Sequence, residues 1–161
     1  MTDLTDAIQR GWATADPDAP EPTVSYFHDL LAGHADDRHA LFAYAGALDF
    51  AGREAEAAPV YELALAAGLD GDELRQGLVQ YGSTLRNLER FGEAVKTLQQ
   101  ADDQFPGQAS VKVFLALALT SAGRCHEAVQ ILVTLALDHV DRDELQHYQR
   151  ALRYYAAALT T

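Results

Sequence analysis

The feature that most constrains this chain is a pattern of small and large residues that returns about every 34 residues. The first copy reads Leu41-x-x-Tyr44-Ala45-x-x-Leu48, then Ala57-x-x-x-Tyr61-x-x-Ala64; the second reads Leu78-x-x-Tyr81-Gly82-x-x-Leu85, then Ala94-x-x-x-Leu98-x-x-Ala101. A third copy reads Leu115-Ala116-x-x-Leu119, then Ala128-x-x-x-Leu132-x-x-Leu135. Such a period is typical of solenoids, in which each unit buries its apolar side against the next unit.

Within each copy, apolar residues recur at three- and four-residue steps in two runs, which predicts two amphipathic helices. Gly52 and Gly123 lie where the first helix of a copy must end, and we expect both in the left-handed conformation. Each copy is therefore predicted to be a helix-turn-helix hairpin.

Capping signals mark the boundaries between hairpins. Gly68 indicates the end of a helix, and Asp70 with Glu73 three residues later predicts a capping box. Asp141 and Glu144 predict the same arrangement before the last helix. These signals divide the chain between the repeated segments.

Small residues within the pattern predict close helix crossings. They are Ala45, Gly82 and Ala116 on the first helices and Ala57, Ala94 and Ala128 on the second helices. A larger side chain at such a position would overpack the contact between two helices.

The expected fold is all-α, a right-handed superhelix of antiparallel helix-turn-helix repeats with a C-terminal capping helix. We expect a single domain over residues 1–161, with a degenerate leading hairpin at 4–37, repeats at 38–71, 75–108 and 109–141, and the capping helix at 142–158. The capping helix has no second helix and should close the stack.

The charge of the chain narrows the class of partner. Twelve Lys and Arg against 24 Asp and Glu give a formal net charge of -12, which disfavours nucleic acid and anionic membranes. No export signal and no long apolar span are visible, so we expect a soluble, cytoplasmic protein.

The repeated residues resemble the tetratricopeptide repeat pattern of large-x-x-large-small-x-x-large followed by small-x-x-x-aromatic. The chain is also similar to a small bacterial family, tetratricopeptide repeat group five, through residues 61–69, 81–88 and 91–95. This resemblance implies a protein- or peptide-binding scaffold that needs no cofactor and holds its ligand in a groove lined by the first helices.

The predicted groove residues are Phe42, Arg86, Asn87, Phe114, Arg150 and Arg153. Guanidinium groups can grip a carboxylate bidentately, which favours an acidic peptide or a free C-terminus as ligand. Alternatively, Arg150 and Arg153 only neutralise acidic neighbours on a solvated face. The phenylalanines are either ligand anchors or core residues, and we expect Phe50 rather than Phe42 to turn into the core.

No catalytic or metal-binding motif stands out. Neighbouring residues on a helix point about 100° apart, so Cys125 and His126 should not form a nucleophile pair. The acidic segment 138–143 lacks the glycine and the final glutamate of a calcium loop. We expect a protein that is not an enzyme and binds no metal, with self-association into a homo-oligomer as the alternative function.

Overall fold

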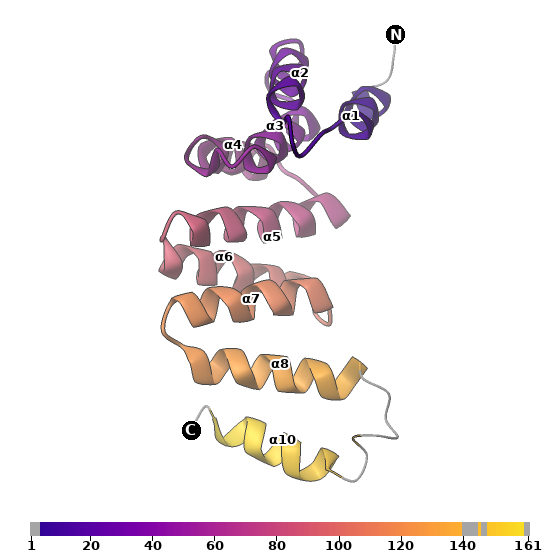
Figure 1. Ribbon diagram of the computed structural model, residues 1–161. Helices are drawn as coiled ribbons and strands as arrows, with labels where there is room; N and C mark the ends of the chain where they lie inside the picture. Colours follow the sequence, from indigo (N-terminus) through magenta and orange to yellow (C-terminus); the bar gives the residue numbers. More distant parts are fainter. Residues whose placement is uncertain (1–3, 140–144, 146–147, 160–161) are drawn as a thin grey trace.

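The computed structural model describes residues 4–139, 145 and 148–159, and every regular element in this part of the chain is a helix. The helices are α1 (Leu4–Ala13), α2 (Glu21–Ala32), α3 (Arg38–Phe50), α4 (Glu54–Ala66), α5 (Gly71–Asn87), α6 (Phe91–Gln104), α7 (Ala109–Ser121), α8 (Cys125–His139) and α10 (Gln149–Ala158). They form a helical repeat superhelix in which α5, α6, α7, α8 and α10 stack beneath one another, below the group formed by α1 to α4, with the two termini at opposite ends (Figure 1). The predicted all-α repeat fold is confirmed.

Contacts between helices follow the chain order. The closest packing joins α3 with α4, α5 with α6 and α7 with α8, and each pair also packs against the next. Helices α1 and α2 precede the first of these hairpins, and α10 packs against α8 (Figure 1). Of the predicted capping helix, residues 142–144 and 146–147 lie outside the described residues; the division of the chain into repeat units stays a prediction.

Small residues lie at the helix crossings, as the sequence predicts. Ala45, Ala57 and Ala94 are fully buried, and Tyr61 and Leu98 fill the space beside them with 0% exposure. All five belong to one continuous apolar core that runs from α2 to α8. The helices therefore approach one another closely because no side chain beyond a methyl group separates them at these points.

Each turn inside a hairpin contains one residue in the left-handed conformation. Gly52 and Gly123 have φ values of 69° and 77°, and Glu89 takes the corresponding place between α5 and α6 with a φ of 59°. The prediction for the two glycines is confirmed. Glu89 holds a conformation that a side chain disfavours, since the turn requires it there.

The predicted capping box at Asp70 is wrong. Asp70 is the N-cap residue of α5 but its side chain caps nothing; its Oδ2 lies 2.9 Å from Nη2 of Arg38 instead. Glu73 likewise turns to the preceding hairpin and accepts a hydrogen bond from Nδ1 of His39. Charged partners in the neighbouring repeat outcompete the local cap. A side-chain cap does form at Asp37, which accepts from the backbone N–H groups of the first turn of α3. The Asp141–Glu144 signal lies outside the described residues.

The tightest of the crossings gives a test of the packing. A Cβ added to Gly82 would lie 2.5 Å from Cγ of Leu98, whereas a Cβ added to Gly92 meets no atom within 4 Å. We expect Gly82→Ala to lower the free energy of unfolding by about 1–2 kcal/mol, because overpacking outweighs the gain in helix propensity. Gly92→Ala is the control and should leave this free energy unchanged or raise it by up to ~1 kcal/mol. Urea unfolding measures both; equal effects of the two variants would refute the close crossing.

Candidate functional site

Two adjoining cavities lie along the surface formed by α1, α3 and α5. The larger has a volume of about 440 Å³ and is lined by Ile8, Trp12, His39, Phe42, Ala43, Gly46, Glu73, Gln76 and Gln80. The smaller has a volume of about 320 Å³ and is lined by Trp12, Gly46, Asp49, Phe50, Tyr61 and Gln80. Since Trp12, Gly46 and Gln80 line both cavities, we treat them as one surface and call it the N-terminal groove.

Trp12 forms the outer wall of the N-terminal groove. Its ring packs on Phe27 at a centroid distance of 4.9 Å and meets Phe50 edge to face at 6.1 Å. Gly46 lies directly opposite, and a Cβ at that position would come within 3.2 Å of Cζ2 of Trp12. Because the ring is still 37% exposed, it presents an aromatic surface to the groove and to solvent.

A polar network borders the larger cavity. Nδ1 of His39 is hydrogen-bonded to Oε2 of Glu73, while Nε2 of His39 accepts from Nε of Arg38 at 3.3 Å. With Nε2 accepting from Arg38, Nδ1 is the nitrogen that donates to Glu73. The Glu73 carboxylate is thereby held at the edge of the larger cavity.

Asp49 supplies a second carboxylate, in the smaller cavity. Its Oδ1 accepts a hydrogen bond of 3.1 Å from Oγ1 of Thr84, which is fully buried. Burial raises the pKa of the Asp49 carboxyl above its usual range; the hydrogen bond from Thr84 opposes this shift, and the charge of nearby Glu54 adds to it. No Lys or Arg in the described part of the chain forms an ion pair with Asp49. The groove thus contains a partly desolvated carboxylate without a cationic partner.

Of the three phenylalanines considered above, only Phe50 lies in a place that differs from the expectation. Phe42 is half-buried, packs on the core, and still lines the larger cavity. Phe114 on α7 is also half-buried against the core. Phe50, which we expected to be the more buried, is 38% exposed and lines the smaller cavity. That expectation is wrong because Trp12 from α1 gives Phe50 an aromatic partner outside the core.

The predicted arginines do not gather in one place. Arg86 and Asn87 lie at the end of α5, where Nη2 of Arg86 donates to Oδ1 of Asn87 at 3.3 Å. Arg150 and Arg153 lie on α10, at the far end of the stack from α3 (Figure 1). Arg150 is exposed, and Nη2 of Arg153 lies 2.9 Å from Oδ1 of Asp138 on α8. The ion pair of Arg153 matches the alternative in which it balances a neighbouring acid. The binding role of these residues stays a prediction.

Sequence reasoning missed the contribution of α1 and of Glu73 to the cavities. Ile8 and Trp12 line the larger cavity although they belong to the segment whose repeat pattern is faint. Their four-residue spacing, continued from Leu4, was the available signal, since it places the three side chains on one face of a helix.

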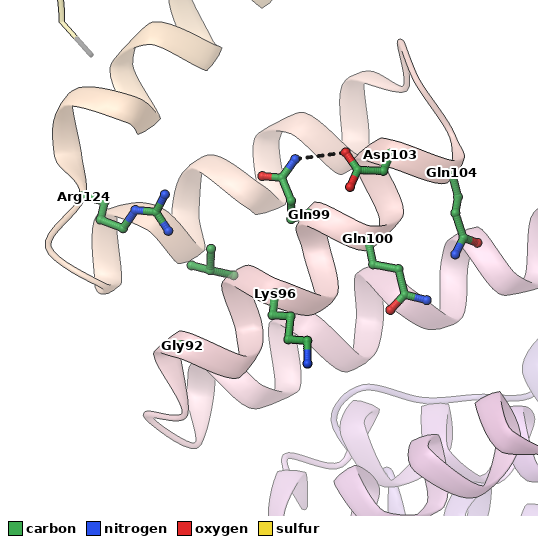
Figure 2. Close-up of a pocket in the computed structure, with 8 residues that line it drawn as sticks. Gly92, Lys96, Gln99, Gln100, Asp103, Gln104 and Arg124 are labelled. Carbon is green, nitrogen blue, oxygen red and sulfur yellow. Dashed lines mark hydrogen bonds between the residues drawn. The ribbon is translucent and has the colours of Figure 1, made fainter. Parts of the chain in front are cut away.

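A different depression lies on the surface of α6. It has a volume of about 610 Å³ and is lined by Gly92, Val95, Lys96, Gln99, Gln100, Asp103, Gln104 and Arg124. Figure 2 shows long polar side chains around it, with Gln99 hydrogen-bonded to Asp103 at 3.3 Å. It offers no aromatic side chain and almost all of its lining comes from one helix, so it lacks the convergent walls of a ligand site.

Metal-binding clusters and membrane-spanning helices are both absent from the described part of the chain. No group of three or more His, Cys, Asp and Glu residues there is arranged to hold a metal ion. Cys125 is exposed, and most of the acidic segment 138–143 lies outside the described residues. None of the described helices combines the length and apolarity that crossing a bilayer requires.

The raised pKa of Asp49 has a measurable effect on stability. Because the folded protein holds the Asp49 proton more tightly than the unfolded chain does, the ionised carboxylate destabilises the fold at neutral pH, and this penalty vanishes as the pH falls to about 4. We expect Asp49→Asn to be more stable than the wild type at pH 7, with a difference that shrinks toward pH 4. Asp103→Asn, which removes an exposed carboxylate from α6, is the control. Urea unfolding at both pH values tests this; a pH-independent difference for Asp49→Asn would contradict it.

Comparisons with known proteins agree with this architecture. A family profile described as tetratrico peptide repeat matches residues 38–159. Among solved structures, YrrB, described as a TPR protein with an unusual peptide-binding site, has a TM-score of 0.68 at 16% identity, covering 98% of this chain and 82% of that one. A double mutant of MamA has a TM-score of 0.69 at 16% identity, covering 98% and 88%. No curated protein matches the sequence significantly. The profile spans most of the chain, so this protein belongs to the tetratrico peptide repeat family.

Proposed function

We propose that this chain is a non-catalytic scaffold that binds a protein or peptide partner along the surface of its first helices, with the N-terminal groove as the main contact. The observation that carries this proposal is the pair of adjoining cavities between α1, α3 and α5. Aromatic rings and carboxylates converge there from α1, α3, α4 and α5. A few polar groups set in apolar walls are typical of ligand sites. Trp12, Phe42 and Phe50 are only partly buried there, and aromatic residues of this kind anchor peptide ligands.

The structural likeness to YrrB supports a peptide as the ligand. YrrB is described as having an unusual peptide-binding site, and its fold matches 98% of the length of this chain. At 16% identity the likeness covers the fold alone, so the residues that bind must be argued from this chain itself.

Arg86 and Asn87 are the best candidates for gripping an acidic group or a C-terminal carboxylate of the ligand. Arg86 has no ion-pair partner among the described residues; its Nε is buried, and its Nη2 donates to Oδ1 of Asn87. A guanidinium whose charge is not balanced by a neighbouring acid gains most from a ligand carboxylate. Arg153 contributes less, since Asp138 already occupies one edge of it.

Affinity capture tests the role of Arg86. Wild-type protein and Arg86→Glu are immobilised, and proteins recovered from a lysate of the source organism are quantified by mass spectrometry. We expect Arg86→Glu to reduce recovery of the specific partners at least about tenfold, because it replaces a charge-assisted hydrogen bond by repulsion. Lys96→Glu makes the same charge change on α6 and should leave recovery unchanged. An Arg150→Glu, Arg153→Glu double variant tests the α10 residues separately. Equal recovery by wild type and Arg86→Glu would remove Arg86 from the site.

Self-association is the alternative function, and one observation favours it. Tyr61 and Leu98 are fully buried, whereas Leu132, which takes the same repeat position on α8, is 43% exposed. Val129 beside it is 46% exposed, and Tyr154 and Tyr155 on α10 are exposed as well. This end of the stack therefore offers an apolar face on which a second copy of the chain would fit.

Light scattering over a range of protein concentrations separates the two functions. The scaffold proposal expects a monomer at every concentration, for the wild type and for Leu132→Glu alike. The alternative expects a dimer that Leu132→Glu dissociates, because a charge placed in an apolar interface is strongly unfavourable. The control Leu63→Glu changes a leucine of α4 that is 58% exposed and should leave the mass unchanged.

A further inference from the structure

The smaller cavity of the N-terminal groove has the chemistry of a cation site. From these residues we propose that it binds a basic side chain, lysine or arginine, of the peptide ligand, with Asp49 as the counter-charge and the rings of Trp12 and Phe50 as walls. This inference rests on the proposed function, since it names the ligand group that the groove of that scaffold recognises.

The Asp49 carboxylate is partly buried and lacks a cationic partner among the described residues. The side chain is half-buried and has only uncharged hydrogen-bond donors beside it, the hydroxyls of Thr84 and Tyr61, and no described Lys or Arg pairs with it. Its pKa is raised by burial and further by the negative charge of Glu54. Carboxylates that lose water are normally paired within the protein, so one that is left unpaired in a cavity is suited to a cation from outside.

Two aromatic rings line the cavity that contains this carboxylate. Trp12 and Phe50 both line the cavity of Asp49 and remain 37% and 38% exposed. Their edge-to-face arrangement, at 6.1 Å between centroids, sets two rings at nearly a right angle. A cation over a ring face is attracted by the ring quadrupole, most strongly by tryptophan, and the apolar stem of Lys or Arg packs on the same surface.

The charged side chains that line the groove are acidic. Among the residues that line the two cavities, none is Lys or Arg, whereas Asp49 and Glu73 are both acidic. Oε2 of Glu73 is hydrogen-bonded to Nδ1 of His39, which holds this carboxylate at the edge of the larger cavity. The whole chain carries a formal charge of -12, which draws a basic ligand toward it.

The test begins with phage that display random dodecapeptides, selected on the immobilised full-length protein. An enriched peptide is then synthesised with its Lys or Arg and, for comparison, with norleucine at that position, which keeps the stem but removes the charge. The chain has one tryptophan, so the fluorescence of Trp12 reports binding at the groove itself, and calorimetry gives the dissociation constants.

We expect selected peptides to be rich in Lys or Arg and norleucine to weaken binding to the wild type at least about tenfold. In Asp49→Asn, which keeps the shape of the side chain, the basic peptide and its norleucine form should bind within about twofold of each other, as a double-mutant cycle requires when the charges interact. Asp103→Asn should retain the full wild-type discrimination. Trp12→Leu is a second variant, read by calorimetry, and should also weaken the basic peptide.

Two outcomes overturn the inference and are distinguishable. If peptides are enriched and perturb Trp12 fluorescence, but norleucine binds as well as Lys or Asp49→Asn keeps the discrimination, the groove binds peptides without recognising a basic group. If no peptide is enriched on the folded protein, the proposed function fails and this inference fails with it.

Discussion

Close approach of helices at small residues is the constraint on which this structure depends. Ala45, Ala57 and Ala94 have no exposed surface, and Gly82 lies so near Leu98 that even a methyl group would clash. Since each crossing fixes the distance and angle between two helices, the hairpins stack with little freedom. The helices α3, α5 and α7 then contact one another in turn along one side of the stack, and the N-terminal groove lies on this side.

Helix α1 adds a wall to one part of this repeated surface and so completes the N-terminal groove. Its Trp12 sits over Gly46 and beside Phe50, so that one wall of the groove comes from the segment least like a repeat. Polar contacts between repeats hold the opposite wall in place. His39 reaches Glu73, and Thr84 reaches Asp49, in each case across 34 or 35 residues of sequence. A site assembled in this way is preorganised because its walls belong to packed helices.

Several arginines of this acidic chain are paired with glutamates at the starts of helices. Arg53, Arg90 and Arg124 each make a two-pronged hydrogen bond to the glutamate three residues later, at the start of α4, α6 and α8. These pairs lower the pKa of the glutamates through the hydrogen bonds themselves. They use arginine for structure at the same place in each hairpin. Arg86 differs because no carboxylate among the described residues pairs with it, and Asp49 is its counterpart, an acid that no described Lys or Arg pairs with.

The sequence alone determined the repeat, the hairpins, the small residues at the crossings and the left-handed glycines of the turns, because each follows from spacing along one helix or one turn. Phe42, which the sequence predicts as a groove residue, lines the larger cavity, and its role in binding stays a prediction. Only the tertiary structure decided that Asp70 and Glu73 pair with the preceding hairpin, that Phe50 stays outside the core, and that α10 lies far from α3. These outcomes depend on competition between partners distant in sequence, and a local pattern holds no information about which partner lies closer in space.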